Sequence, residues 1–129
     1  MTAKSHSDRL KRMAQRTPKE VARALYSAGQ LIELDAERSI TSGAVSGVNH
    51  IPSNPGQPPN ADTHFLDSNI ETRIGGPGLV IVESLAPYSA ALEYGTSRIS
   101  PRPFMSPAVQ RNRKKVIELV GEAVNITIR

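Results

Sequence analysis

Residues 58–107 read PPNADTHFLDSNIETRIGGPGLVIVESLAPYSAALEYGTSRISPRPFMSP, and this stretch decides the fold. Its centre holds the strongest strand signal of the chain, residues 79–84 (LVIVES), in which three β-branched residues follow one another. Residues 69–74 (NIETRI) alternate between apolar and polar side chains, and Gly75-Gly76-Pro77-Gly78 separates the two segments. The pattern predicts an antiparallel β-hairpin.

A helix is predicted upstream of the hairpin. Thr17-Pro18-Lys19-Glu20 is typical of a helix start, because Thr17 can cap the helix and Pro18 suits its first position. Apolar residues then recur at helical spacing, which predicts a helix over residues 18–40. Gly29 lies inside this helix, and a close contact with another element would explain it. Residues 1–16 are expected to form an N-terminal arm or a short helix.

Further elements are predicted around and after the hairpin. Asp62-Thr63 can cap a short helix or turn in which Phe65 and Leu66 face inward. Residues 88–94 suit a short helix that ends at Gly95, and Ser106-Pro107 marks the start of a last helix over about 107–124. The alternation of residues 125–129 (NITIR) favours an additional strand.

The expected fold class is α+β, in a single domain over residues 1–129. It has a long N-terminal helix, a small antiparallel sheet with a hairpin, and a C-terminal helix packed on the sheet. Residues 41–61 are rich in Gly, Ser, Asn and Pro, which disfavours a helix there. We expect this segment to be an extended loop, or an arm laid along a neighbouring subunit and ordered only after assembly.

The composition excludes several classes of protein. There is no cysteine, so disulfides and thiolate metal sites are excluded. No apolar run reaches the length of a signal peptide or of a membrane span, so we expect a soluble, unsecreted protein. The apolar fraction is 38% with no Trp, which predicts a modest core and suits a subunit that its neighbours complete.

Charge is segregated along the chain. Residues 1–23 carry seven Lys/Arg and two Asp/Glu, residues 24–97 carry two and eight, and residues 98–129 carry seven and two. Three interpretations remain open: solvated helix faces, pairing of the basic ends of one subunit with the acidic middle of another, and contact with DNA. The run Arg111-Asn112-Arg113-Lys114-Lys115 is the best candidate for binding nucleic acid. No aromatic residue interleaves with it, so a solvated helix face is favoured.

Catalytic chemistry is not indicated anywhere in the sequence. The three histidines, His6, His50 and His64, lie in polar contexts, and no pair of carboxylates stands out by its spacing. We therefore expect no enzyme, no cofactor and no metal site.

Two patterns within residues 58–107 carry a resemblance. The entry pattern consists of Pro58, Pro59, Asp62, Thr63, Leu66 and Ile70. The exit pattern is the more specific one and consists of Tyr88, Glu93, Tyr94, Gly95, Thr96, Pro101, Pro103, Phe104 and Pro107. Over residues 17–124 the chain resembles the neck and tail-completion proteins of long-tailed double-stranded DNA phages, a lambdoid family often labelled "putative tail component". It departs from them at His64, where the family often has Gly, and in lacking a strand before the long helix.

The resemblance implies a structural virion protein of the head–tail connector, assembled in the cytoplasm of the bacterial host. Its partners would be further copies of itself in a ring, six favoured and twelve second, with portal, adaptor or stopper proteins on the head side. The tail terminator or tail tube would lie on the tail side, and DNA would pass through the lumen without sequence recognition; no membrane is involved. A tail terminator ring and a small basic nucleic-acid-binding protein are the alternatives.

The candidate subunit-interface residues are Pro58, Pro59, Tyr88, Glu93, Tyr94 and Phe104. Structural roles compete with this assignment at three positions. Gly95 suits a left-handed helix cap, Tyr94 could pack in the core, and Phe104 could anchor either in a neighbour or in the core of its own subunit.

Overall fold

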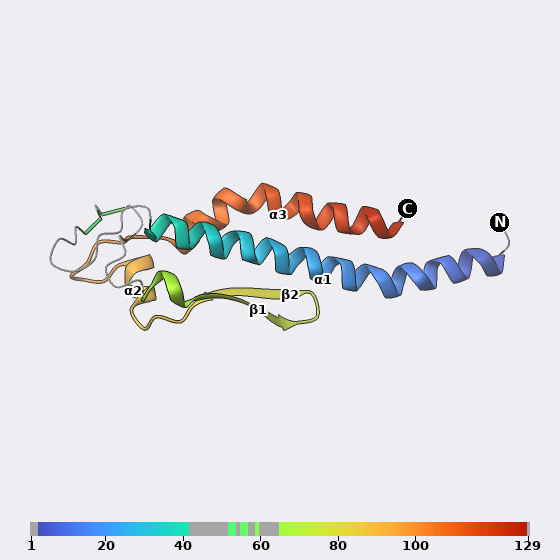
Figure 1. The fold of residues 1–129 in the computed structure, drawn as a ribbon, viewed down its shortest axis with the longest axis horizontal. Coiled ribbons are helices and arrows are strands. Elements are labelled where there is room, and N and C mark those ends of the chain that lie inside the picture. Colours follow the sequence, from blue (N-terminus) through green and yellow to red (C-terminus); the bar gives the residue numbers. More distant parts are fainter. Residues whose placement is uncertain (1–2, 42–51, 54, 57–58, 60–64, 129) are drawn as a thin grey trace.

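The long helix α1 (Ala3–Thr41) is the axis of the molecule. The computed structural model describes residues 3–41, 52–53, 55–56, 59 and 65–128. Helix α3 (Met105–Ile128) packs on one side of α1, and the hairpin of β1 (Ile70–Gly76) and β2 (Leu79–Ser84) packs on the other (Figure 1). The 3-10 turn η2 (Asp67–Asn69) precedes the hairpin, and the short helix α2 (Ser89–Tyr94) follows it. The predicted α+β class is confirmed.

The predicted start of α1 is wrong. The helix begins at Ala3 and continues through Pro18, whereas Thr17 and Pro18 were expected to open it. A proline inside a helix removes one backbone hydrogen bond and bends the axis, and residues with good helix propensity on both sides outweigh that cost here. The axis of α1 changes direction in its N-terminal part (blue in Figure 1), as expected for a proline kink.

The hairpin rests on α1 through a point of close approach at Gly29. Strand β1 pairs antiparallel with β2, so that Thr72 lies opposite Val82 and Ile74 opposite Val80. A Cβ atom at Gly29 would lie 2.6 Å from Thr72 Cγ2 and 3.0 Å from Val80 Cγ1. The predicted hairpin and the predicted close contact at Gly29 are therefore both confirmed.

Helix α3 runs antiparallel to α1 (Figure 1). Both helices bury small residues, which permits the axes to approach closely: Ala28 and Ala36 from α1, Ala108 and Ala123 from α3. The first turn of α3 lies beside the end of β2.

The expected strand at residues 125–129 is wrong, because the helix continues to Ile128. An alternation of five residues does not outweigh the low cost of extending an existing helix.

The tightest core lies at the C-terminal end of α1. Phe104 and Ile40 are fully buried there, together with Leu66 and Ile70. The inward orientation predicted for Leu66 is confirmed, but Phe65 is 47% exposed and its predicted orientation is wrong.

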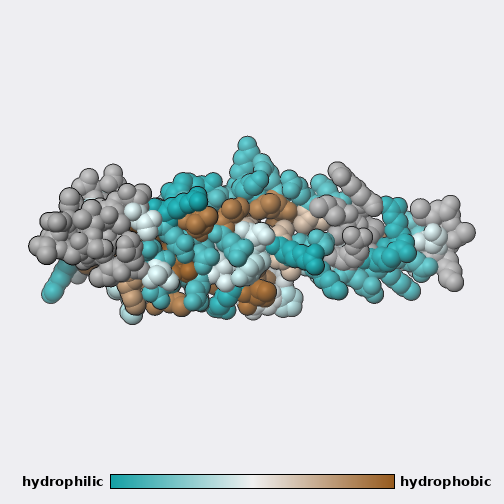
Figure 2. All heavy atoms as spheres, viewed as in Figure 1, coloured by the Kyte–Doolittle hydropathy of each residue, from teal (hydrophilic) through white to brown (hydrophobic). Residues whose placement is uncertain are grey.

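The opposite end of the molecule consists of the first turns of α1, which extend beyond both α3 and the hairpin (Figure 1). The residues coloured by hydropathy at this end are mostly hydrophilic, and hydrophobic residues gather over the middle of the body (Figure 2). None of the helices in the described ranges combines the length and hydropathy that a membrane span needs.

Three described positions of the 41–61 segment pack against their own chain. The Gly56 amide donates a hydrogen bond to the Pro101 carbonyl at 2.8 Å, and Ser53 and Pro59 are buried. At these positions the contacts lie within the subunit, and the arm hypothesis for the segment as a whole stays a prediction. Most of the segment lies outside the described residues, as do Pro58 and the predicted Asp62-Thr63 cap.

Candidate functional site

The carboxylate of Glu93 caps the N-terminus of α3. One carboxylate oxygen accepts hydrogen bonds from the backbone amides of Phe104 at 2.9 Å and Met105 at 3.0 Å, and the other accepts from the Ser106 amide at 2.8 Å. The first amides of a helix have no partner within it, and a negative charge there also favours the helix dipole. Ser106 had been expected to cap this helix. Glu93, eleven residues upstream of Phe104, caps it instead.

Gly95 allows the chain to turn sharply after α2. Its φ is +76°, and a Cβ atom would lie 2.8 Å from the Ile99 carbonyl oxygen and 2.9 Å from Pro101 Cδ. Its amide donates to the Ala91 carbonyl at 2.9 Å. The role of Gly95 as a helix cap is therefore confirmed, and the position needs glycine for its φ and for the space.

The loop after Gly95 is closed by Thr96. The Thr96 hydroxyl accepts hydrogen bonds from the amides of Arg98 at 3.2 Å and Ile99 at 3.1 Å, while the Thr96 amide donates to the Ile99 carbonyl at 2.8 Å. The chain then returns to α2, where the Arg102 amide donates to the Leu92 carbonyl at 2.6 Å. Residues 93–106 thus form one hydrogen-bonded unit, which we call the clasp.

Phe104 is the apolar anchor of the clasp. Its side chain is fully buried among core residues of its own subunit. It is therefore not available as an anchor in a neighbour, which corrects its place among the interface candidates.

Two tyrosines of the exit pattern remain accessible. Tyr94 is 80% exposed, so the alternative that it packs in the core is wrong. Tyr88 is 44% exposed and packs against Phe65, with ring centroids 6.1 Å apart and planes tilted by 39°. Of the five interface candidates that the structure describes, Tyr88 and Tyr94 present a large exposed side chain, whereas Pro59 is buried and Glu93 is half-buried.

An acidic group that the sequence analysis missed lies beside Tyr88. Burial raises the pKa of Glu37, and the charges of Glu33 and Asp67 raise it further. Burial, followed by the charge of Asp67, also raises the pKa of Tyr88. Glu33 and Glu37 lie one turn apart on α1, η2 with Asp67 packs against α1, and Phe65, two residues before Asp67, contacts the Tyr88 ring. The three carboxylates and the two rings therefore lie around the contact between α1 and η2. The four-residue spacing of Glu33 and Glu37 on a helix was the signal that could have identified part of it.

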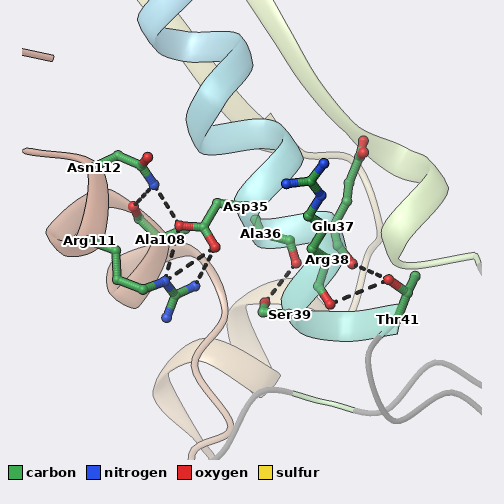
Figure 3. A network of polar contacts seen from close by, with 9 residues as sticks. All are labelled: Asp35, Ala36, Glu37, Arg38, Ser39, Thr41, Ala108, Arg111 and Asn112. Atoms are coloured by element: carbon green, nitrogen blue, oxygen red, sulfur yellow. Dashed lines mark hydrogen bonds and ion pairs between the residues drawn. The ribbon is translucent and has the colours of Figure 1, made fainter. Parts of the chain in front are cut away.

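The basic run of α3 divides into two groups. Arg111 donates to the Asp35 carboxylate through Nε and through an Nη nitrogen at 3.0 to 3.2 Å, and the Asn112 amide donates to the same carboxylate at 2.6 Å (Figure 3). The hydrogen bond from Arg111 lowers the pKa of Asp35 and outweighs the opposite effect of burial. Arg113, Lys114 and Lys115 are exposed. Arg111 therefore joins α3 to α1, and the other three form the charged outer face.

A cleft of about 470 Å³ lies between the end of β2, α2 and the first turns of α3. Glu83 and Glu93 are its acidic lining residues, and both carboxylate oxygens of Glu93 already accept backbone hydrogen bonds. Within the described ranges, no three His, Asp or Glu side chains gather in a way that could hold a metal ion.

Comparison with known proteins gives no match to this chain, among family models, curated proteins or solved structures.

Proposed function

We propose that this chain is a structural, non-enzymatic subunit of the head–tail connector of a tailed double-stranded DNA phage. Copies of the subunit form a ring that joins head to tail during assembly and lets DNA pass. The subunit resides in the neck of the virion and is assembled in the cytoplasm of the bacterial host. The resemblance of residues 88–107 to neck and tail-completion proteins gives the class, and the structure supplies independent support for a subunit of an assembly.

The projecting part of α1 is the observation that carries the proposal. The side chains described within residues 5–15 are all exposed, and this part of the helix extends beyond the body (Figure 1). An isolated helical segment of about a dozen residues is only marginally stable in water. A subunit that extends such a helix away from its own core is suited to binding another molecule.

Exposed apolar side chains support the same conclusion. Ile74 and Leu79 near the hairpin tip, Tyr94 at the end of α2 and Ile117 on α3 are all more than half exposed. They lie on different elements, so a neighbour on each side would be needed to cover them. When each subunit binds its neighbour through two different surfaces, the same contact repeats from copy to copy. The copies close into a ring if the rotation at each contact permits it. A tail terminator ring would use the same surfaces.

A basic nucleic-acid-binding protein is the second candidate, because two exposed basic pairs support it. Lys11 and Arg12 lie on the projecting helix, and Lys114 and Lys115 lie on α3. Such a protein would bind duplex DNA with an affinity that falls steeply as salt rises. The connector is favoured because Arg111 pairs with Asp35 of its own chain and the remaining charges lie on separate helices.

Electron microscopy of intact particles with this subunit labelled tests the proposal. We expect the label in a ring at the junction of head and tail. A label in the capsid lattice or at the tail tip would refute it. The solution mass separates the second candidate, since a ring has a fixed mass without DNA, whereas a DNA-binding monomer or dimer associates only when DNA is added.

A further inference from the structure

The clustered acids and rings described above form a surface that attracts a cationic partner. We call it the acidic–aromatic patch, and its members are Glu33, Glu37, Phe65, Asp67 and Tyr88. Neighbouring negative charges destabilise one another, and after burial they are the second reason why the pKa of Glu37 is raised. An incoming Lys or Arg relieves that repulsion and can also stack on an aromatic face. Phe65 and Tyr88 supply exposed ring surface beside the acids.

The projecting part of α1 has the complementary chemistry. Residues 5–15, which we call the arm, carry the exposed basic pair Lys11 and Arg12. Leu10 lies next to this pair and is 51% exposed, so the arm also offers an apolar side chain to an aromatic surface. The arm is helical, so these side chains project from one helix.

One chain cannot bring its own arm to its own patch. Arg12 and Glu33 lie on the same helix, 21 residues apart, which corresponds to roughly 30 Å along the axis. The patch lies near the C-terminal end of α1, beside η2, and the arm lies at the other end (Figure 1). The two surfaces can meet only between different copies of the chain.

We propose that the arm of one subunit docks on the acidic–aromatic patch of its neighbour. The occupant of the patch is thus a second copy of this chain, selected by charge and by the exposed rings. Because the arm and the patch lie at opposite ends of the subunit, each copy gives one contact and receives another. This is the head-to-tail arrangement from which rings are built. The inference rests on the proposed ring and specifies which surfaces form it.

Charge exchange tests the pairing. The arm variant is Lys11→Glu with Arg12→Glu, the patch variant is Glu33→Lys with Glu37→Lys, and the third variant combines all four changes. The matched control is Lys114→Glu with Lys115→Glu, an adjacent exposed basic pair on the other long helix. The mass of each purified full-length variant is measured by sedimentation at several concentrations and two salt levels. Circular dichroism checks folding, and Glu33→Gln with Glu37→Gln replaces the patch variant if the lysines prevent it.

We expect the wild type and the control to assemble alike. The arm variant and the patch variant should each associate at least about tenfold more weakly, and the combined variant should recover much of the loss. Assembly of the wild type should also weaken as salt rises.

Three results would overturn the inference: a wild type that stays monomeric in low salt, equal loss in the arm variant and the control, or no recovery in the combined variant. An arm variant that assembles normally but loses duplex DNA binding would assign the arm to nucleic acid instead. None of these results moves a labelled subunit away from the neck, so the microscopy test of the proposed function stands apart.

Discussion

The C-terminal half of α1 packs against α3 and the hairpin, whereas the described side chains of the N-terminal arm of the same helix are exposed to solvent. Ala28, Gly29, Ala36 and Ile40 are buried between α3 and the hairpin. The described side chains of the arm are exposed, and most of them are polar or charged. The two regions share one backbone conformation, yet only the first contributes apolar burial to the fold.

This contrast separates two uses of a helix. Where the helix is covered, its sequence is constrained by packing, as the close approach at Gly29 shows. Where the helix projects, its described side chains are exposed, and the charges of Lys11 and Arg12 face solvent. We therefore expect substitutions at the covered end to change the free energy of unfolding and substitutions in the arm to change association.

Removal of the Phe104 ring should have the largest effect. Phe104→Ala leaves a cavity in the tightest part of the core, and we expect a loss of about 3–5 kcal/mol in the free energy of unfolding. Tyr94→Ala, which removes an aromatic side chain from the surface, should cost less than about 0.5 kcal/mol. Urea denaturation of both variants measures the difference. Equal losses would mean that the core is not centred on Phe104.

Loss of the Glu93 carboxylate should come next. Glu93→Ala leaves the first amides of α3 without their acceptor, and we expect a loss of about 2 kcal/mol. The control, Glu118→Ala, removes an exposed carboxylate from α3 and should change the free energy of unfolding by less than about 0.5 kcal/mol. Thermal unfolding of the pair checks this. If Glu93→Ala were as stable as the control, the cap would have no energetic role.

Two glycine substitutions should have opposite signs. Alanine is favoured over glycine by about 1 kcal/mol inside a helix. At Gly121 a Cβ atom meets nothing within 4 Å, so Gly121→Ala should stabilise the protein by about that amount. At Gly29 the Cβ atom would collide with Thr72 and Val80, and overpacking should turn the gain into a net loss of about 1 kcal/mol. A stabilising Gly29→Ala would show that the hairpin does not press on α1.

The smallest change in the free energy of unfolding is expected for the ion pair between Arg111 of α3 and Asp35 of α1. Both partners of the pair are partly exposed, so Arg111→Ala should cost about 1 kcal/mol, and Arg113→Ala close to nothing. The pKa of Asp35 is lowered in the folded chain. The stabilisation that its ionised carboxylate provides is therefore fully present above about pH 4, and it is lost as the pH falls through the folded pKa. The difference between the two variants, measured by urea denaturation, should therefore shrink in acid. A difference that did not change as the pH was lowered through the acid range would exclude the ion pair as its source.

The parts of the fold that the sequence predicted are those determined by local patterns. The LVIVES strand, the glycine-rich turn and the cap at Gly95 follow from residues that lie next to one another. The start of α1 was mispredicted because Pro18 is a strong local signal for a helix start, and the favourable residues before it were given too little weight. The strand at residues 125–129 was mispredicted because a short alternation cannot be told from the end of a helix without its surroundings.

The candidate site depended on contacts that the sequence does not reveal. Glu93 binds amides 11 to 13 residues away, and only the fold brings them together. Phe104 was left open between the core and an interface, and its burial settled the question. The acidic–aromatic patch joins α1, η2 and the segment after β2, so no single stretch of sequence contains it.

Hydrogen exchange along α1, measured in the free subunit and in the assembled form, tests the contrast between its two ends most directly. We predict slow exchange over residues 28–40 in both states, because packing protects that part of the helix. We predict fast exchange over residues 5–15 in the free subunit and strong protection after assembly. Equal protection of both regions in the free subunit, or unchanged fast exchange of residues 5–15 after assembly, would contradict the account.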